Sequence, residues 1–131
     1  MRAHILLAIL LTFSLAAIAQ TGMDEAMALY KGTENLDFSA ERGKEFWNTP
    51  RTDENGKERS CNTCHGKDLT KTGKHIKTGK KIEPMAPSVN KERYTDLKKI
   101  EKWFKRNCKW TIGRECTNQE KGDVLSFLSG Q

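Results

Sequence analysis

The sequence has few of the residues that build most metal and thiol sites. It contains four cysteines and three histidines in 131 residues. A cysteine-based structural zinc site needs a second close cysteine pair, but Cys108 and Cys116 are too far apart to form one. The strand–helix–strand pattern around a thioredoxin-like dithiol is absent as well. The sequence therefore argues against both classes of site.

Long hydrophobic runs are absent after residue 19. Before it, residues 5–16 are apolar and residues 17–19 read Ala-Ile-Ala, which is an A-x-A cleavage signal. The run is too short for a bilayer anchor and is typical of a secretory signal peptide. We predict that residues 1–19 are a cleaved signal peptide and that residues 20–131 form one periplasmic domain. A multidomain enzyme, a membrane-spanning protein and a cytosolic thiol enzyme are thereby excluded.

Apolar residues are also scarce, at 36% of the chain. A small polar domain buries only a modest core and needs a disulfide, a metal or a large apolar cofactor for stability. Positive charge is in excess, with a net charge of +6. Many lysines lie in residues 67–81 and 98–109, where they suit electrostatic steering onto an acidic redox partner. Nucleic acid is not an expected partner, because the chain is predicted to be exported and lacks a known nucleic-acid-binding motif.

Apolar residues at helical spacing predict an all-α fold with long loops. Residues 49–60 are polar and are expected to form a loop, and residues 66–90 a longer loop with at most a brief hairpin. Helices are expected at residues 23–31, 40–48, 96–107 and 118–129, with N-caps at Ser39, at Thr95 or Asp96, and at Thr117.

Cys61-Asn62-Thr63-Cys64-His65 is the strongest signal in the sequence. C-x-x-C-H is the attachment pattern of c-type haem. Two cysteines three positions apart can each bond one vinyl group of the same porphyrin, and a ring nitrogen of the following histidine can ligate the iron. We therefore predict one haem c, covalently attached through Cys61 and Cys64, with His65 as an axial ligand. The porphyrin also supplies apolar surface that the small core lacks.

The element order resembles that of class I cytochromes c, in which the first and last core helices cross closely at a glycine. Gly43 lies in the helix before the C-x-x-C-H motif, and it would let Val124 or Phe127 of the last helix approach. We expect an all-α, class I cytochrome c fold wrapped around one covalently attached haem.

Several candidates compete for the axial position opposite His65. Met85 lies where an electron-carrying class I cytochrome places its methionine, or else it packs on the haem edge. His75 would give a bis-histidine haem, but its segment is rich in lysine and glycine and suggests exposure. The position can also lack a protein ligand. The expected helix at residues 96–107 has an apolar stripe, which consists of Leu97, Ile100, Trp103 and Phe104. Asn107 lies about 20° from Ile100 on a helical wheel and so belongs to this stripe. An amide that faces the core needs a hydrogen-bond or metal partner. That partner is either iron or, if Asn107 is a C-cap, the end of the helix.

Cys108 and Cys116 remain after haem attachment. Spare cysteines of an exported protein are expected to pair, and the loop they close would contribute ~2.5 kcal/mol in the chain-entropy model. The bridge would begin next to Asn107, fix where the helix ends and so control how far the Asn107 side chain moves.

The sequence resembles the SHP (sphaeroides haem protein) group of monohaem class I cytochromes over essentially all of residues 20–131. The resemblance is densest in residues 61–66, 78–84, 86–87, 99–108, 113–116 and 120–125. In that family the asparagine before the first disulfide cysteine is the distal haem ligand, which implies this role for Asn107 and a Cys108–Cys116 disulfide. The related cytochrome c'' has histidine there. Met85 departs from the family pattern, in which a non-ligating residue such as leucine is expected.

The resemblance also implies a function. A carboxamide is a weak, hard ligand that suits ferric better than ferrous iron. Reduction is therefore expected to release Asn107 and to let the iron bind a diatomic gas: O₂, NO or CO. A dihaem cytochrome c is the implied electron donor, and a monomer is the expected form.

Two alternatives to this function are considered. One is a simple electron-transfer cytochrome with His65 and Met85 as ligands, and the other is a haem enzyme that reduces or detoxifies O₂ or NO. No catalytic residue is identifiable, since His65 and His75 are the only histidines after residue 4.

Overall fold

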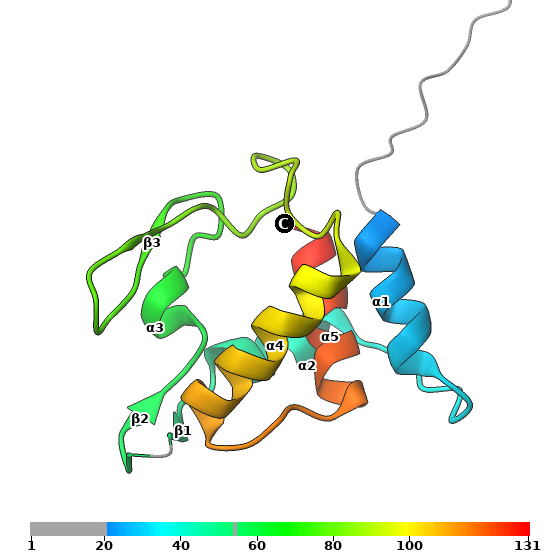
Figure 1. The fold of residues 1–131 in the computed structure, drawn as a ribbon, viewed down its shortest axis with the longest axis horizontal. Coiled ribbons are helices and arrows are strands. Elements are labelled where there is room, and N and C mark those ends of the chain that lie inside the picture. Colours follow the sequence, from blue (N-terminus) through cyan, green and yellow to red (C-terminus); the bar gives the residue numbers. More distant parts are fainter. Residues whose placement is uncertain (1–20, 54) are drawn as a thin grey trace, which may run out of the picture.

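A computed structural model describes residues 21–53 and 55–131 of the chain. Within them the helices are α1 (Thr21–Lys31), α2 (Ala40–Asn48), α3 (Asn62–His65), α4 (Leu97–Ile112) and α5 (Asn118–Ser129). Figure 1 shows α4 crossing in front of α2 and α5, with α1 on one side and α3 on the other. The predicted signal peptide, residues 1–19, lies outside the described residues. Among the helices that are described, none is both long and apolar enough to span a bilayer.

Two short antiparallel hairpins flank α3. They consist of β1 (Arg51–Thr52) with β2 (Glu58–Arg59), and of β3 (Gly73–Lys74) with β4 (Lys81–Ile82). The second lies where the sequence allows a brief hairpin. The first lies in a segment that the sequence predicts to be a plain loop. Its turn is held by the Asp53 carboxylate, which accepts the backbone N–H groups of Asn55 and Lys57 at 2.8 Å each.

The N-terminal ends of α2, α4 and α5 lie where the sequence predicts them. Ser39 caps α2, Asp96 caps α4, and Thr117 forms the predicted capping box at α5 with Glu120. Each cap side chain accepts a backbone N–H that the first turn leaves without a partner, which stabilises a helix by ~1 kcal/mol. These local signals are strong enough to fix where the three helices begin.

The C-terminal end of α4 lies further along the chain than predicted. The helix continues past Asn107 to Ile112, and Gly113 then adopts a left-handed backbone with φ of 73° and donates its N–H to the Lys109 carbonyl. Glycine takes this conformation without strain, so it marks the true helix end. The prediction that the helix ends near Asn107 is therefore wrong, and so is the interpretation of Asn107 as a C-cap.

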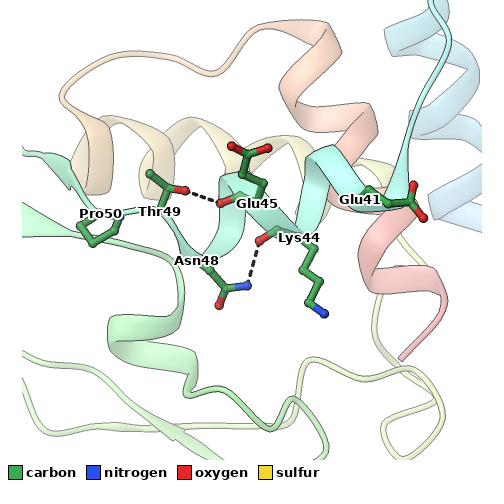
Figure 2. A pocket seen from close by; sticks show the side chains of 6 residues that line it. All are labelled: Glu41, Lys44, Glu45, Asn48, Thr49 and Pro50. Atoms are coloured by element: carbon green, nitrogen blue, oxygen red, sulfur yellow. Dashed lines mark hydrogen bonds between the residues drawn. The ribbon is translucent and has the colours of Figure 1, made fainter.

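The C-terminal end of α2 borders a solvent-facing hollow, shown in Figure 2. The Asn48 and Thr49 side chains donate to the carbonyls of Lys44 and Glu45 at 2.8 and 2.7 Å. The Glu45 carbonyl also accepts the Thr49 backbone N–H at 2.9 Å, so the side-chain bonds add to the backbone bond that closes the helix. The residues lining the hollow include neither cysteine nor histidine, so the hollow is separate from the C-x-x-C-H motif.

α2 and α5 cross in direct contact at Gly43. A Cβ atom added there would lie 1.9 Å from the carbonyl oxygen of Asp123 and 2.9 Å from Cβ of Phe127. Only glycine fits this position without displacing backbone. The close crossing predicted from the sequence is confirmed, and of the two expected partners Phe127 is in contact while Asp123 takes the place of Val124.

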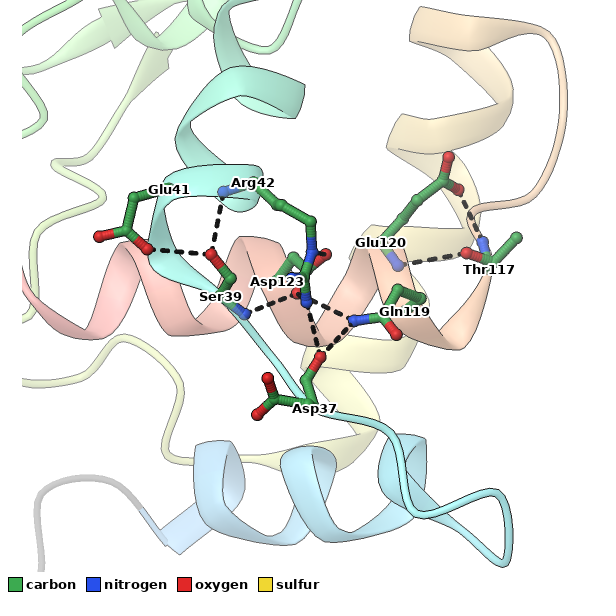
Figure 3. Close-up of polar contacts among 8 residues, drawn as sticks. All are labelled: Asp37, Ser39, Glu41, Arg42, Thr117, Gln119, Glu120 and Asp123. Atoms are coloured by element: carbon green, nitrogen blue, oxygen red, sulfur yellow. Dashed lines mark hydrogen bonds and ion pairs between the residues drawn. The ribbon is translucent and has the colours of Figure 1, made fainter.

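A buried carboxylate beside this crossing joins the start of α2 to α5, as Figure 3 shows. Asp123 accepts the Ser39 backbone N–H at 2.7 Å and the Arg42 Nε–H at 2.8 Å, and Gln119 donates to it at 3.0 Å. Burial opposes its charged form. The bonds from Arg42, Ser39 and Gln119 outweigh that effect and hold the pKa of Asp123 below its ordinary value.

The apolar core has two parts. The first joins α1 to α4 and α5 through the buried residues Met23, Ala26, Tyr30, Ile100 and Leu125. The second, which we call the Trp47 cluster, joins α2 to α5 and to the long loop through Trp47, Leu69, Ala86, Val124 and Leu128. Each fully buried aliphatic side chain contributes ~1.5–3 kcal/mol. The Trp47 cluster also contacts α3, and so it positions the functional site.

Candidate functional site

α3 brings both thiols of the C-x-x-C-H motif onto one helical turn. Cys61 is its N-cap residue and Cys64 lies inside it. The His65 N–H donates to the Cys61 carbonyl at 3.2 Å. Both thiols are free and half-buried, and burial raises the pKa of Cys61 to about 12. The site thus presents two unpaired thiols at the spacing that covalent haem attachment requires.

β3 passes directly over the backbone of α3. A Cβ atom at Gly73 would lie 2.3 Å from the Cys64 carbonyl oxygen and 2.9 Å from Cα of His65. On the same hairpin, the Ile76 N–H donates to Sγ of Cys64 at 3.5 Å. Sequence reasoning misses Gly73, because nothing local distinguishes it from the other glycines of this loop.

The His65 ring lies against Trp47, with ring centroids 5.2 Å apart. Burial, with a smaller contribution from the positive charge of Arg93, lowers the pKa of His65 to about 4. The imidazole is therefore neutral at neutral pH, as a metal ligand must be. Its Nδ1 atom is buried and has no hydrogen-bond partner among the described residues, which fits a side chain whose partner is a cofactor.

Met85 packs against the same Trp47 cluster. Its N–H donates to the Leu69 carbonyl at 3.0 Å, and its carbonyl accepts the Tyr94 hydroxyl at 2.9 Å. The backbone of Met85 is therefore held beside the cluster on which the His65 ring lies.

His75 is half-buried, where its lysine-rich segment suggests exposure. Its Nδ1 accepts the backbone N–H groups of Lys77 and Thr78 at 3.3 and 3.2 Å. Its ring lies 4.8 Å from that of Trp110, centroid to centroid. The side chain of His75 is therefore engaged with its own hairpin and with α4.

The apolar stripe predicted along α4 divides into two faces. Ile100 and Phe104 pack into the core with α1, whereas Trp103 is 47% exposed and Asn107 is also exposed. Trp103 and Asn107 lie ~40° apart on the helix, on one flank of it. Trp110 extends this flank by one turn. Sequence reasoning misses it because the predicted helix stops at Asn107; continuing the wheel to Gly113 would have found it.

Cys108 and Cys116 form a disulfide, with their Cα atoms 5.6 Å apart and both residues buried. The predicted pairing is confirmed. The bridge connects α4, directly after Asn107, to the segment that precedes α5. It does not fix the end of the helix as expected, since α4 continues to Ile112.

Positive side chains cover the solvent side of α4. Arg106 lies over the ring of Trp103, with Cζ 5.2 Å from its centroid. The exposed members, which we call the α4 basic surface, are Lys98, Lys99, Lys102, Lys105, Arg106 and Lys109.

The residues present fit a c-type haem. Cys61, Cys64 and His65 supply the groups for two thioethers and one iron ligand. Ile76 and Trp103 are 54% and 47% exposed, and they offer apolar surface that a flat porphyrin can cover. Nη1 of Arg59 is buried without a hydrogen-bond partner in the described residues, and the carboxylates of a haem are the class of group that a guanidinium binds.

Comparison with known proteins agrees with this fit. A family model described as a domain of unknown function, DUF1924, matches residues 33–128. Cytochrome c-type protein SHP from Cereibacter sphaeroides is 40% identical over 116 residues, which are 88% of this chain and 89% of that protein. Cytochrome c'' from Methylophilus methylotrophus is 40% identical over 86 residues, which are 66% of this chain and 60% of that protein.

Solved structures give the same result. The structure of oxidised SHP, an oxygen-binding cytochrome c, matches with a TM-score of 0.77 at 39% identity, over 86% of this chain and 99% of that one. Oxidised cytochrome c'' matches with a TM-score of 0.74 at 32% identity, over 85% and 95%. The predicted all-α cytochrome fold is confirmed. By sequence and by structure, the chain belongs to the DUF1924 family and to the SHP group of c-type cytochromes, which carry one covalently attached haem c.

Proposed function

We propose that this protein is a periplasmic cytochrome that accepts electrons and binds a diatomic gas (O₂, NO or CO) when reduction releases Asn107 from the haem iron. Residues 1–19 act as the export signal and residues 20–131 as the cytochrome domain. Cys61 and Cys64 would hold the haem through two thioethers, and His65 and Asn107 would supply the protein ligands of its iron. The haem supplies the iron that takes up the electron and the gas.

The position of Met85 is the observation that carries this proposal. Met85 is anchored beside the Trp47 cluster, against which the His65 ring also lies. Its backbone N–H and carbonyl are both engaged, with Leu69 and with Tyr94, so the position of Met85 is explained by packing and hydrogen bonding without a metal. Met85 then serves as a packing residue, as the leucine expected there in the SHP group would.

Asn107 is the better candidate for the opposite face. It lies within a continuous helix, four residues after the exposed Trp103, and its own side chain is exposed. His75 competes weakly, since its Nδ1 already accepts two backbone N–H groups. The amide of Asn107 therefore has both the exposure and the rigid support that an axial ligand needs.

Reduction weakens an amide ligand more than a thioether ligand. A neutral carboxamide oxygen is a hard donor and prefers ferric iron, so Asn107 loses affinity when the iron gains an electron. The relatives support this direction. SHP is an oxygen-binding cytochrome c, and a solution structure of cytochrome c'' concerns haem-ligand detachment in that protein.

The α4 basic surface supplies a docking face for the electron donor. Its members lie along the same helix as Asn107, so a partner bound there comes close to the haem. Surface charge of one sign raises association rates and makes them fall with ionic strength. The donor is an acidic redox protein, for which a dihaem cytochrome c is the family-based expectation.

Visible spectra of the ferric and ferrous forms test the proposed ligation. Ferric wild type should be low-spin, and dithionite reduction should give a high-spin species that binds CO. Asn107→Ala should be high-spin in both states. Met85→Leu is the matched control, because it replaces the rival ligand by a side chain of similar volume and should leave both spectra unchanged.

The opposite pattern would overturn the proposal. In that pattern, the ferrous wild type stays low-spin and does not bind CO, and the spectra change in Met85→Leu but not in Asn107→Ala. Such a result would identify a simple electron-transfer cytochrome.

A further inference from the structure

The Trp110 ring contacts two side chains, one from before and one from after the C-x-x-C-H motif. The guanidinium Cζ of Arg59 is 4.6 Å from the centroid of the Trp110 ring. The ring of His75 is 4.8 Å from it, at an interplanar angle of 38°. We call this arrangement the Arg59–Trp110–His75 stack. Because Trp110 follows Asn107 by less than one turn of α4, the stack holds the part of the helix that carries Asn107.

The Arg59 side of the stack is rigid. Its Nε donates to Oδ2 of Asp53 at 2.6 Å, and the two side chains are only 12% and 1% exposed. Asp53 in turn accepts two backbone N–H groups of the β1–β2 turn. A guanidinium held in this way cannot follow Trp110 if α4 moves. Cation–π attraction is also stronger when both partners are shielded from water.

The His75 side of the stack is tied to α3. His75 directly follows β3, whose Gly73 lies against the backbone of Cys64 and His65. Two backbone N–H groups hold its Nδ1 and so fix the orientation of the ring. Arg59 lies two residues before Cys61. Both neighbours of Trp110 are therefore attached to the segment that holds the haem.

A second restraint acts on the same part of α4. The disulfide at Cys108 joins the helix to the segment before α5, so Asn107 lies between a covalent bridge and an aromatic contact. A shift or rotation of this part of the helix would disrupt both. Release of Asn107 by helix movement is therefore disfavoured, whereas rotation about its own side-chain bonds disrupts neither.

We propose that Trp110 is a positioning residue: the Arg59–Trp110–His75 stack keeps the end of α4 fixed to the haem-attachment segment, so that Asn107 binds and leaves the iron by side-chain rotation alone. This proposal rests on the proposed role of Asn107 as distal ligand. The stack acts on the ferric state, where it holds the amide in place against competing ligands.

Cyanide binding to the ferric protein tests the proposal, since cyanide must displace Asn107. Trp110→Leu removes the stack and should raise both the ferric high-spin fraction and the cyanide affinity, the latter about tenfold if one shielded cation–π contact is lost. Trp110→Phe retains an aromatic face and should stay near wild type. His75→Ala should act in the same direction as Trp110→Leu, while His75→Phe should not, because it retains an aromatic ring beside Trp110.

Hydrogen exchange supplies a readout that a change in haem chemistry alone would not move. In ferric Trp110→Leu, the amides of residues 107–112 should exchange faster than in wild type, while those of α5 should be unchanged. His75→Ala gives the same test if Trp110→Leu folds poorly, since it leaves the helix sequence intact.

Two results would contradict the inference in distinguishable ways. If Asn107→Ala alters the ferric spectrum but Trp110→Leu and His75→Ala leave spectrum, cyanide affinity and exchange at wild-type values, the stack has no positioning role and the proposed function survives. If Asn107→Ala leaves the ferric spectrum unchanged, the proposed function fails, and the inference about Trp110 fails with it.

Discussion

The α2–α5 crossing and the region between α3 and α4 are built on opposite principles. At the crossing, Gly43 brings two backbones into contact, and Asp123 satisfies the polar groups around it. Around α3 and α4 there are free thiols, a buried histidine nitrogen that has no hydrogen-bond partner within residues 21–53 and 55–131, and an exposed tryptophan. The crossing is held by backbone contact and by the hydrogen bonds of Asp123, whereas the other region presents groups that fit a haem. Changes at the crossing should therefore affect stability, and changes near α3 and α4 should affect ligation.

Removing both thiols should have the largest effect. In the double variant Cys61→Ser with Cys64→Ser, the haem loses its covalent attachment. The small core then loses the apolar surface of the porphyrin, which adds to its buried area. We expect loss of haem staining on a denaturing gel and loss of a cooperative thermal transition. The matched control is Cys108→Ser with Cys116→Ser, which should retain covalent haem. Covalent haem in the first double variant would refute the attachment.

Gly43→Ala should cause the next largest effect. Its Cβ would lie 1.9 Å from the Asp123 carbonyl oxygen, so two backbones must separate, at a cost of ~3 kcal/mol. Urea unfolding should show a lower midpoint, while the ferric and ferrous spectra should stay those of wild type. A spectrum that changes as much as the stability would show that the two regions are not independent.

Opening the disulfide should affect both regions. Cys108→Ser with Cys116→Ser should lower the free energy of unfolding by ~2.5 kcal/mol, since the bridge no longer restrains the unfolded chain. It should also raise the ferric high-spin fraction, because the bridge begins beside Asn107. Spectra and urea midpoints measured on the same samples separate the two effects. An unchanged spin state would show that the bridge serves stability alone.

The smallest effect should come from pH at Asp123. Its folded-state pKa is lowered, so its contribution is present above the unfolded value of about 3.9 and disappears as pH falls through the folded value. Wild type should lose stability partly for this reason as pH falls from about 5 through the unfolded value and then through the lower folded value. Asp123→Asn should be less stable at pH 7 by ~1–2 kcal/mol and should lose less on acidification. Equal acid sensitivity of urea midpoints in the two proteins would exclude Asp123 as a contributor.

Local signals in the sequence predict the crossing region better than the haem region. Ser39, Asp96 and Thr117 carry their own cap chemistry, and Gly43 is recognisable from its helix, so these features can be predicted without tertiary information. The end of α4 also has a local signal, Gly113, which the sequence prediction does not use. The contact of Arg59 with Trp110 joins the β1–β2 hairpin to α4, and no local pattern specifies it. The axial role of Asn107 stays a prediction, based on the family resemblance and now supported by its place on α4.

The burial of Cys61 bears on the order of events in maturation. A thiol reacts as its thiolate, and a pKa of about 12 leaves almost none of that form at neutral pH in the folded chain. β3 also lies across the backbone of Cys64 and His65 with no room for even a methyl group at Gly73. In a chain that folds before it meets haem, the Cys61 thiol is therefore protonated and β3 already lies against the backbone of Cys64 and His65. We therefore expect the thioether bonds to form before the β3–β4 hairpin packs against α3.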